Sequence, residues 1–326
     1  MKRGAGSGVI QRFLAFLDYH TLTGQSVGVA FSGGPDSTAL AICASEARNA
    51  GRLTPVLVHV DHGVRPGRPD RVFVQQTAQV LELELRTVNL TLIASSSEAE
   101  MREARYAALS ETLLPFGITR VMTGHHAMDQ AETVLLHLAR GEGLEGASGM
   151  SPIETLTFGS HVLAVGRPFL REDPGTLRDL VAEYQLRVVQ DPTNASLDHA
   201  RNLVRHQVIP VLSRINSAAV SNIARSAEIL RWENDALEHL TLAWMADNAE
   251  RDTIDGQLLG SLAPAIQRRV LRAWVEAKIG LALSFDRTES LRKLADTGRG
   301  DAKVELGEGW SARQVRRRIT LHRDDA

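Results

Sequence analysis

The sequence predicts an α/β fold with a doubly wound, mainly parallel sheet, followed by a smaller and mostly helical C-terminal domain. Over the first two hundred residues, apolar strand-like runs alternate with amphipathic helical segments. A glycine turn joins the first strand to the first of these helices, and the strand signal stops after Pro210. Strands that are apolar on both faces and alternate with helices are typical of parallel sheets, which bind ligands at their carboxyl ends.

The elements follow in order along the chain. We expect strands at 27–32, 56–61, 83–90, 118–125 and 161–169, with helices between them at 38–50, 70–82, 97–114 and 127–140. Helices are expected again at 215–249, 265–279 and 286–295, and 302–322 reads as a β-hairpin around Gly307 and Gly309 that ends in the arginine cluster 316–318. The predicted domains are therefore an α/β domain at 1–212 and a mostly helical domain at 213–326 that ends in the β-hairpin.

The composition is that of an ordinary soluble chain of 326 residues with a formal net charge of −2. We expect a cytoplasmic protein without a membrane partner, because no stretch resembles a membrane span or a signal peptide. The single cysteine, Cys43, is expected in the core, and its isolation disfavours thiolation chemistry that needs a cysteine pair or an iron–sulfur cluster. Residues 201–326 are mildly basic, with 20 Lys and Arg against 17 Asp and Glu.

The turn after the first strand reads SGGPDS, which predicts a phosphate site. Gly33 and Gly34 let a ligand approach the backbone at a helix N-terminus, where free N–H groups and the helix dipole attract anions. Asp36 adds a carboxylate for a hard cation such as Mg²⁺. The alternative is an ordinary Gly-Pro turn that binds no ligand. The full set of expected nucleotide-binding residues in this turn is Ser32, Gly33, Gly34, Pro35, Asp36 and Ser37.

Two other strand ends carry polar side chains. His59, Asp61 and His62 leave the second strand, and GHHAMDQAET follows the fourth, at 124–133. Asp129 and Glu132 share one helix face there, so Asp129 and Asp36 form a candidate Mg²⁺ site. Zinc is the rival metal, although the spacing is not that of HExxH enzymes.

A third cluster surrounds the turn DPTN at 191–194. Arg201 and Arg205 lie one helical turn apart, and such arginines suit phosphate or carboxylate recognition. Taken alone, they indicate a solvated helix face.

Together these motifs resemble the tRNA(Ile)-lysidine synthetase family of PP-loop ATP pyrophosphatases over about residues 24–215. The matching blocks are SGGPDS, HVDHGVR, RxxRYAAL, the GHH segment up to Met150, RPFL with Arg171, and DPTN followed by RNLVRHQVIPVL. The resemblance implies that ATP with Mg²⁺ adenylates the wobble cytidine of tRNA(Ile) with a CAU anticodon, and that free L-lysine then displaces AMP. It also leaves a homodimer open.

The resemblance implies roles for further residues. Arg105 is expected near the phosphates or the lysine, and Arg171, Asn194, Arg201 and Arg205 are expected to face the tRNA. His125, with Glu132 close by, is the candidate base for the lysine ammonium, and Asp129 is the second candidate. Met128 departs from the family, which has aspartate there. The alternatives are another PP-loop tRNA-modifying ligase and a non-catalytic ATP- and RNA-binding module.

Overall fold

The structure is a computed structural model that describes residues 5–61, 69–90, 98–158, 161–189, 200–248, 253–296 and 302–324. The chain divides into two compact units, Met1–Arg231 and Trp232–Ala326, and the division falls within the helix α10 (Ala219–Asn248). In the described part, no helix combines the length and apolar character needed to cross a membrane.

The first unit is built on a six-stranded sheet in the order β3-β2-β1-β4-β6-β5, parallel except for β5. This confirms the predicted fold class. The antiparallel edge strand was not predicted: β5 returns as a hairpin with β6 and pairs Ile153 with Gly166. The strands are β1 (Ser26–Ala30), β2 (Thr54–Asp61), β3 (Glu84–Asn89), β4 (Arg120–Met122), β5 (Ile153–Phe158) and β6 (His161–Gly166).

Helices cover both faces of this sheet and bury two apolar clusters. One cluster joins β1 and β2 to four helices, α1 (Ala5–Tyr19), α2 (Pro35–Asn49), α3 (Pro69–Val80) and α7 (Pro174–Glu183). The other lies under α4 (Glu98–Leu113), where Leu109 and Leu113 form a cluster with Val121 of β4 and Val165 of β6. The remaining helical segments of this unit are η1 (Leu114–Phe116), α5 (Ala127–Ala139), α6 (Gly143–Ala147), α8 (Ala200–Leu203), the π-helical turn η3 (Val204–Val208) and α9 (Ile209–Ile215).

The order of the strands fixes where a ligand can bind. β1 lies between β2 and β4, and the chain leaves it toward β2 before returning on its other side through β4. In open α/β sheets the ligand crevice lies at such a switch point, outside the carboxyl ends of the strands. The turns after β1 and β4 therefore flank one crevice, and they are the turns that carry SGGPDS and GHH.

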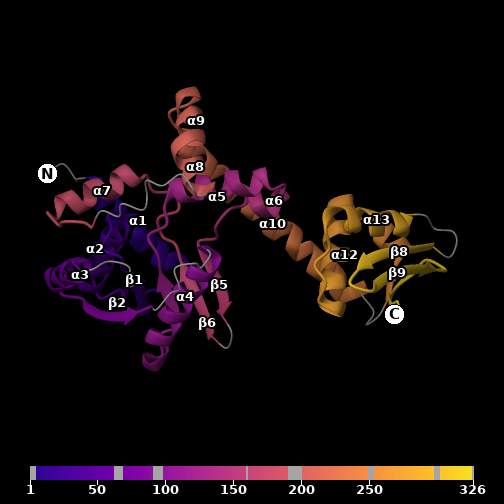
Figure 1. Cartoon of the computed structure of the whole chain (residues 1–326), viewed down its shortest axis with the longest axis horizontal. Helices are drawn as coiled ribbons and strands as arrows, with labels where there is room; N and C mark the ends of the chain where they lie inside the picture. The colour runs from indigo at the N-terminus through magenta and orange to yellow at the C-terminus, as the bar shows by residue number, and fades with distance from the viewer. Residues whose placement is uncertain are drawn as a thin grey trace. The chain divides into compact units, whose positions relative to one another are not determined.

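The second unit combines helices with a four-stranded antiparallel sheet in the order β7-β10-β9-β8. Helices α12 and α13 pack on one side of this sheet around the buried Trp274 and Leu291 (Figure 1). The predicted single hairpin was wrong in one respect, since Arg316 and Arg317 form a second turn and a further strand begins at Arg318. The elements are β7 (Thr253–Asp255), α11 (Gly256–Gly260), α12 (Pro264–Ile279), α13 (Phe285–Asp296), β8 (Ala302–Gly307), β9 (Trp310–Val315) and β10 (Arg318–Arg323).

Candidate active site

The SGGPDS turn is closed by its two serines. Ser37 Oγ accepts a hydrogen bond from the Ser32 amide at 3.2 Å and donates to the Gly34 carbonyl at 3.1 Å. Gly33 has φ +83°, which favours glycine, and Pro35 occupies the first turn of α2. Gly34 is the N-cap, and no side chain caps this helix end. The first amides of α2 are thus available to an anion, as the sequence predicted for a phosphate.

The turn after β4 packs directly on this helix end. A Cβ at Gly124 would lie 2.9 Å from both the carbonyl carbon and the carbonyl oxygen of Asp36, closer than real Cβ contacts come. Glycine is therefore required at position 124, because the two backbones meet there without a side chain between them. This contact brings the residues after Gly124 to the edge of the predicted phosphate site.

His126 lies between the two predicted metal-binding aspartates. Its Nε2 is 3.5 Å from Asp36 Oδ2, its Nδ1 is 3.4 Å from Asp129 Oδ2, and the ring is buried. Burial alone lowers the pKa of His126, but the Asp36 and Asp129 carboxylates outweigh burial, so the net pKa is raised. Asp36 and Asp129, far apart in sequence, therefore face a single imidazole.

Asp129 and Glu132 are held by the arginines that follow the DPTN turn. Arg205 Nε donates to Glu132 Oε1 at 2.5 Å, and Arg201 Nε donates to Glu132 Oε2 at 2.9 Å. Arg205 Nη2 also reaches Asp129 Oδ1 at 3.1 Å, and the Glu132 side chain is fully buried. The shared helix face was predicted correctly. Both guanidinium groups point at carboxylates within the protein, while 28% of the Arg201 side chain and 29% of the Arg205 side chain are exposed, so a contact with tRNA stays a prediction.

His125 is held differently from His126. Its Nδ1 lies 2.8 Å from Thr123 Oγ1. Burial, with further contributions from Arg167 and Arg201, lowers the pKa of His125 to about 3, although the Asp129 carboxylate opposes this change. The ring is therefore neutral near pH 7, and it is a weak base. Glu132, which was expected to assist it, is engaged with the two arginines.

The other described residues that were predicted for the site lie on several elements of the first unit. His59 is buried inside β2 and its Nδ1 is 2.9 Å from the Phe31 carbonyl. This contact holds the backbone just before the SGGPDS turn. Asp61 is the last residue of β2, and Arg105 lies on an exposed position of α4. Arg171 is largely exposed and pairs with Glu228 at 3.3 Å. His62 and Asn194 fall outside the described residues.

The carboxylates fit a magnesium ion. Asp36 is partly exposed at the mouth of the turn, which is the position from which it could share a cation with a phosphate. Asp129 Oδ2 accepts from the His126 amide and Oδ1 from Arg205, yet each carboxylate oxygen has a second lone pair. Among the described residues, no group of three or more His, Cys, Asp or Glu converges as a metal-binding cluster. This donor set suits a cation bound jointly with phosphate oxygens, and it gives no support to zinc.

Two contributors were missed as site residues at the sequence level. Gly124 and His126 belong to the quoted GHH segment, but neither was assigned a role. A glycine directly after a strand, followed by paired histidines, was the available signal. Met128, where the resembled family has aspartate, packs beside the apolar residues Ala131, Val204 and Ile209. The departure therefore places an apolar side chain against an apolar cluster.

Comparison with known proteins places this chain in a family. A family model described as the PP-loop domain matches residues 7–212, and one described as the TilS substrate binding domain matches residues 256–320. The tRNA(Ile)-lysidine synthase of Streptomyces coelicolor is 36% identical over 313 residues, covering 92% of this chain and 86% of that protein. The chain belongs to the tRNA(Ile)-lysidine synthase family.

Other family members give similar values. The tRNA(Ile)-lysidine synthase of Rhodococcus jostii is 35% identical over 311 residues, covering 92% of this chain and 90% of the relative. That of Symbiobacterium thermophilum is 34% identical over 306 residues, and the match covers 88% of this chain but only 63% of the relative's length. Family members thus differ in how much sequence they carry beyond the matched part.

A solved structure supports the fold independently. The U34-tRNA thiolase NcsA from Methanococcus maripaludis, determined with its [4Fe-4S] cluster, aligns with a TM-score of 0.57 at 15% identity. The alignment covers 69% of this chain and 79% of the thiolase. The likeness shows the PP-loop fold alone.

Proposed function

We propose that this chain is an ATP-dependent ligase that joins free lysine to C2 of the wobble cytidine in tRNA(Ile) with a CAU anticodon. The observation that carries the proposal is the convergence of Asp36, His126 and Asp129 at the switch point of a PP-loop sheet. Family membership narrows the reaction class, because relatives that match this chain over most of their length are named tRNA(Ile)-lysidine synthase.

The first step activates the base. The C2 carbonyl oxygen of the cytidine attacks the α-phosphorus of ATP, a P–O bond forms, and pyrophosphate leaves. The N-terminal amides of α2 and the Ser37 hydroxyl are the groups that would hold the departing pyrophosphate. Mg²⁺ held by Asp36 and Asp129 would neutralise the charge that develops on the phosphate oxygens.

The second step forms lysidine. The lysine ε-amine attacks C2, the C2–O bond breaks, and AMP leaves with the oxygen. The amine must first lose a proton, because its ordinary pKa is near 10.4. His125, with a pKa lowered to about 3, is too weak to take that proton efficiently. We therefore propose that the amine loses its proton to solvent before it attacks. His125 is then a neutral polar neighbour of the reacting groups, in place of the base that the sequence led us to expect.

The arginines after the DPTN turn receive a new assignment in this proposal. Arg201 and Arg205 position Asp129 and Glu132, since the Nε of each donates to Glu132 and Arg205 Nη2 also reaches Asp129. Arg105, Arg171 and Asn194 stay predicted contacts of the phosphates, the lysine or the tRNA. The proposed division of labour keeps ATP chemistry in residues 1–212 and tRNA binding mainly in residues 213–326, and a homodimer stays a prediction.

Two other functions are distinguishable. A thiolase such as the structural neighbour uses an iron–sulfur cluster, whereas this sequence has a single cysteine that is buried. A non-catalytic ATP- and RNA-binding module has no need for two carboxylates beside the phosphate site.

The decisive experiment is nucleoside analysis of tRNA(Ile) after incubation with the protein, ATP, Mg²⁺ and isotopically labelled lysine. We expect label in a modified cytidine, together with release of AMP and pyrophosphate that requires both tRNA and lysine. The variant Asp36→Asn serves as the inactive control. A modified nucleoside without lysine label, or tRNA-independent pyrophosphate release, would contradict the proposal.

A further inference from the structure

The short segment between α6 and β5, residues 148–152, is held by two arginines that bind its backbone, and we call it the strap. Arg231 Nη2 donates to the carbonyls of Ser148 and Met150, at 2.6 and 2.5 Å. Arg167 Nη1 donates to the carbonyl that follows, at 2.8 Å, and the Arg167 side chain is fully buried. Charged donors make stronger hydrogen bonds than neutral ones, so both halves of the strap are firmly anchored.

Gly149 fits between the two carbonyls that Arg231 binds because it has no side chain. Its φ of +58° lies in the left-handed region that favours glycine. A Cβ at this position would lie 2.8 Å from Gln130 Oε1, closer than real Cβ contacts come. The strap therefore lies directly against the Gln130 side chain.

Gln130 joins the strap to the helix α5. The Met150 amide donates to Gln130 Oε1 at 2.8 Å, and Gln130 Nε2 donates to the Met150 carbonyl at 3.1 Å. Gln130 is only 2% exposed. The Met150 carbonyl also accepts from Arg231, so both of its lone pairs are used. A single oxygen atom thus links α5 to α10.

Gln130 directly follows Asp129, the proposed metal ligand, near the start of α5. Residues of one helical turn share backbone hydrogen bonds and move together, so an anchored Gln130 also fixes the backbone of Asp129. Arg205 restrains the same residue differently, because it binds the Asp129 carboxylate at 3.1 Å. The strap therefore sets the backbone from which this carboxylate projects.

A second polar contact links α10 to the rest of the first unit, and it is weaker. Glu228 pairs with Arg171 at 3.3 Å, and the Arg171 side chain is 69% exposed. Ion pairs that are this exposed contribute little to stability. Arg231, by contrast, is partly buried and binds two backbone carbonyls, so it is the stronger of the two links.

We propose that Arg231 is a positioning residue for Asp129, which it reaches through the strap and Gln130. By holding the strap against α5, it keeps Asp129 where this residue can share a magnesium ion with Asp36. Arg231 is also the last residue of the first unit, and α10 continues beyond it to Asn248. The inference rests on the proposed function, in which Asp129 is a metal ligand, and it adds a residue 102 positions further along the chain to that site.

The test follows ATP binding to the full-length protein by calorimetry at a series of Mg²⁺ concentrations. Arg231→Met removes the donors and keeps most of the aliphatic side chain. We expect the Mg²⁺ concentration for half-maximal ATP binding to rise about tenfold, the low end of the effect of removing an outer partner of a metal ligand. Arg231→Lys keeps a charged donor, so its Mg²⁺ requirement should return to within about threefold of the wild type.

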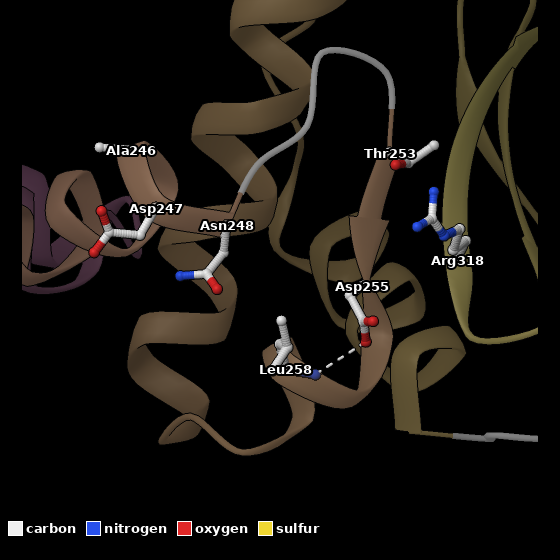
Figure 2. A pocket seen from close by; sticks show the side chains of 7 residues that line it. All are labelled: Ala246, Asp247, Asn248, Thr253, Asp255, Leu258 and Arg318. Atoms are coloured by element: carbon white, nitrogen blue, oxygen red, sulfur yellow. Dashed lines mark hydrogen bonds between the residues drawn. The ribbon is translucent and has the colours of Figure 1, made fainter.

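Two variants on the same helix serve as controls. Arg225→Met makes the same substitution at an exposed arginine, which donates to Asn222 within α10 at 2.9 Å. Asp247→Asn changes the other end of α10, where Asp247 lines a cavity of about 280 Å³ in the second unit (Figure 2). Both are surface changes away from the strap, so their Mg²⁺ requirement should stay within about twofold of the wild type.

Hydrogen exchange gives a readout that needs neither metal nor turnover. We expect faster exchange in peptides that cover residues 124–133 and 148–152 of Arg231→Met, and no change in Arg225→Met. Cys43 is buried in the first unit, and all four tryptophans lie in the second. Protection of Cys43 from a maleimide and tryptophan fluorescence therefore check that each unit stays folded, and both should match the wild type under the assay conditions.

An unchanged Mg²⁺ requirement in Arg231→Met would overturn the positioning role. A raised requirement that comes with equally weakened ATP binding in EDTA, or with loss of Cys43 protection, would overturn it too, because either result indicates general damage to the first unit.

Lysidine formation, measured in parallel, separates this inference from the proposed function. A wild-type protein that forms lysidine, while Arg231→Met keeps the normal Mg²⁺ requirement, rejects only the positioning role. A wild-type protein whose Mg²⁺-dependent ATP binding relies on Arg231, but which forms no lysidine, rejects only the proposed reaction.

Discussion

Replacing Arg205 by methionine should destabilise the first unit, because it leaves the buried Glu132 carboxylate with half of its partners. In the native protein Glu132 accepts from Arg205 at 2.5 and 3.1 Å and from Arg201 at 2.9 Å, with no exposure of its own. Removing one partner of a buried ion pair costs about 3–5 kcal/mol when the remaining charge is left uncompensated. Arg201 remains here and both arginines are partly exposed, so we expect about 2–3 kcal/mol.

Each unit carries its own probe of unfolding, so the stability of the first unit can be measured separately from that of the second. Cys43 is fully buried in the first unit, and burial raises the pKa of its thiol, so it reacts with a maleimide only when that unit opens. We expect the urea midpoint for Cys43 labelling to fall by about 1 M in Arg205→Met, given an m-value of about 2–3 kcal/mol per molar urea. The tryptophan transition, which reports only the second unit, should not move.

The matched control removes an exposed arginine from the same unit. Arg48 pairs with Glu82, whose side chain is 81% exposed, so Arg48→Met should cost less than about 1 kcal/mol. The additional variant Glu132→Gln tests the coupling, since Arg205→Met should cost less in that background than alone. If Arg205→Met shifts the labelling midpoint no more than Arg48→Met does, Glu132 does not depend on this pair and the positioning role is wrong.

Three further outcomes are expected. Gly124→Ala should weaken ATP binding in calorimetry, because its methyl group would meet the Asp36 backbone at 2.9 Å, whereas Gly260→Ala, with open space around it, should bind ATP normally; normal binding by both would remove the close-approach argument. Asp36→Asn should abolish lysidine formation and leave Cys43 protection intact, since the carboxylate is partly exposed, and loss of protection would instead indicate a structural role. The rate at subsaturating lysine should rise about tenfold per pH unit from pH 7 toward 9, because the free amine fraction grows while His125, with a pKa of about 3, stays neutral throughout. A plateau from pH 7 that disappears in His125→Asn would restore His125 as the base.

The sheet and the phosphate turn were predictable because each depends on local sequence. The apolar run before SGGPDS is long enough to identify β1, and the following periodicity identifies α2. β5 was not predicted because its residues lie at an edge of the sheet and are only partly buried, so they show little apolar pattern. The turn at Arg316 and Arg317 was not predicted because arginine is not typical of a left-handed backbone position.

The contacts within the site depend on which strands become neighbours, and local sequence carries little of that information. The spacing of Arg201 and Arg205 predicted their common face, but their partners Asp129 and Glu132 lie on a different helix. Arginines without an evident partner in the sequence are usually exposed to solvent. Here they bind the carboxylates of Asp129 and Glu132 instead. His126 had the same ambiguity, since only the adjacency of β1 and β4 brings Asp36 to its ring.

The adjacency of β1 and β4 also determines where the gene can change length safely. Asp36 and Asp129 follow neighbouring strands, whose spacing is set by sheet hydrogen bonds at about 4.8 Å. The polypeptide between them runs out to the sheet edge through β2 and β3 and back, so residues inserted where a helix leads into the next strand, at the amino ends of the strands, would extend away from the aspartates. These connections can therefore be lengthened, in evolution or by insertion of a reporter, without moving the two aspartates.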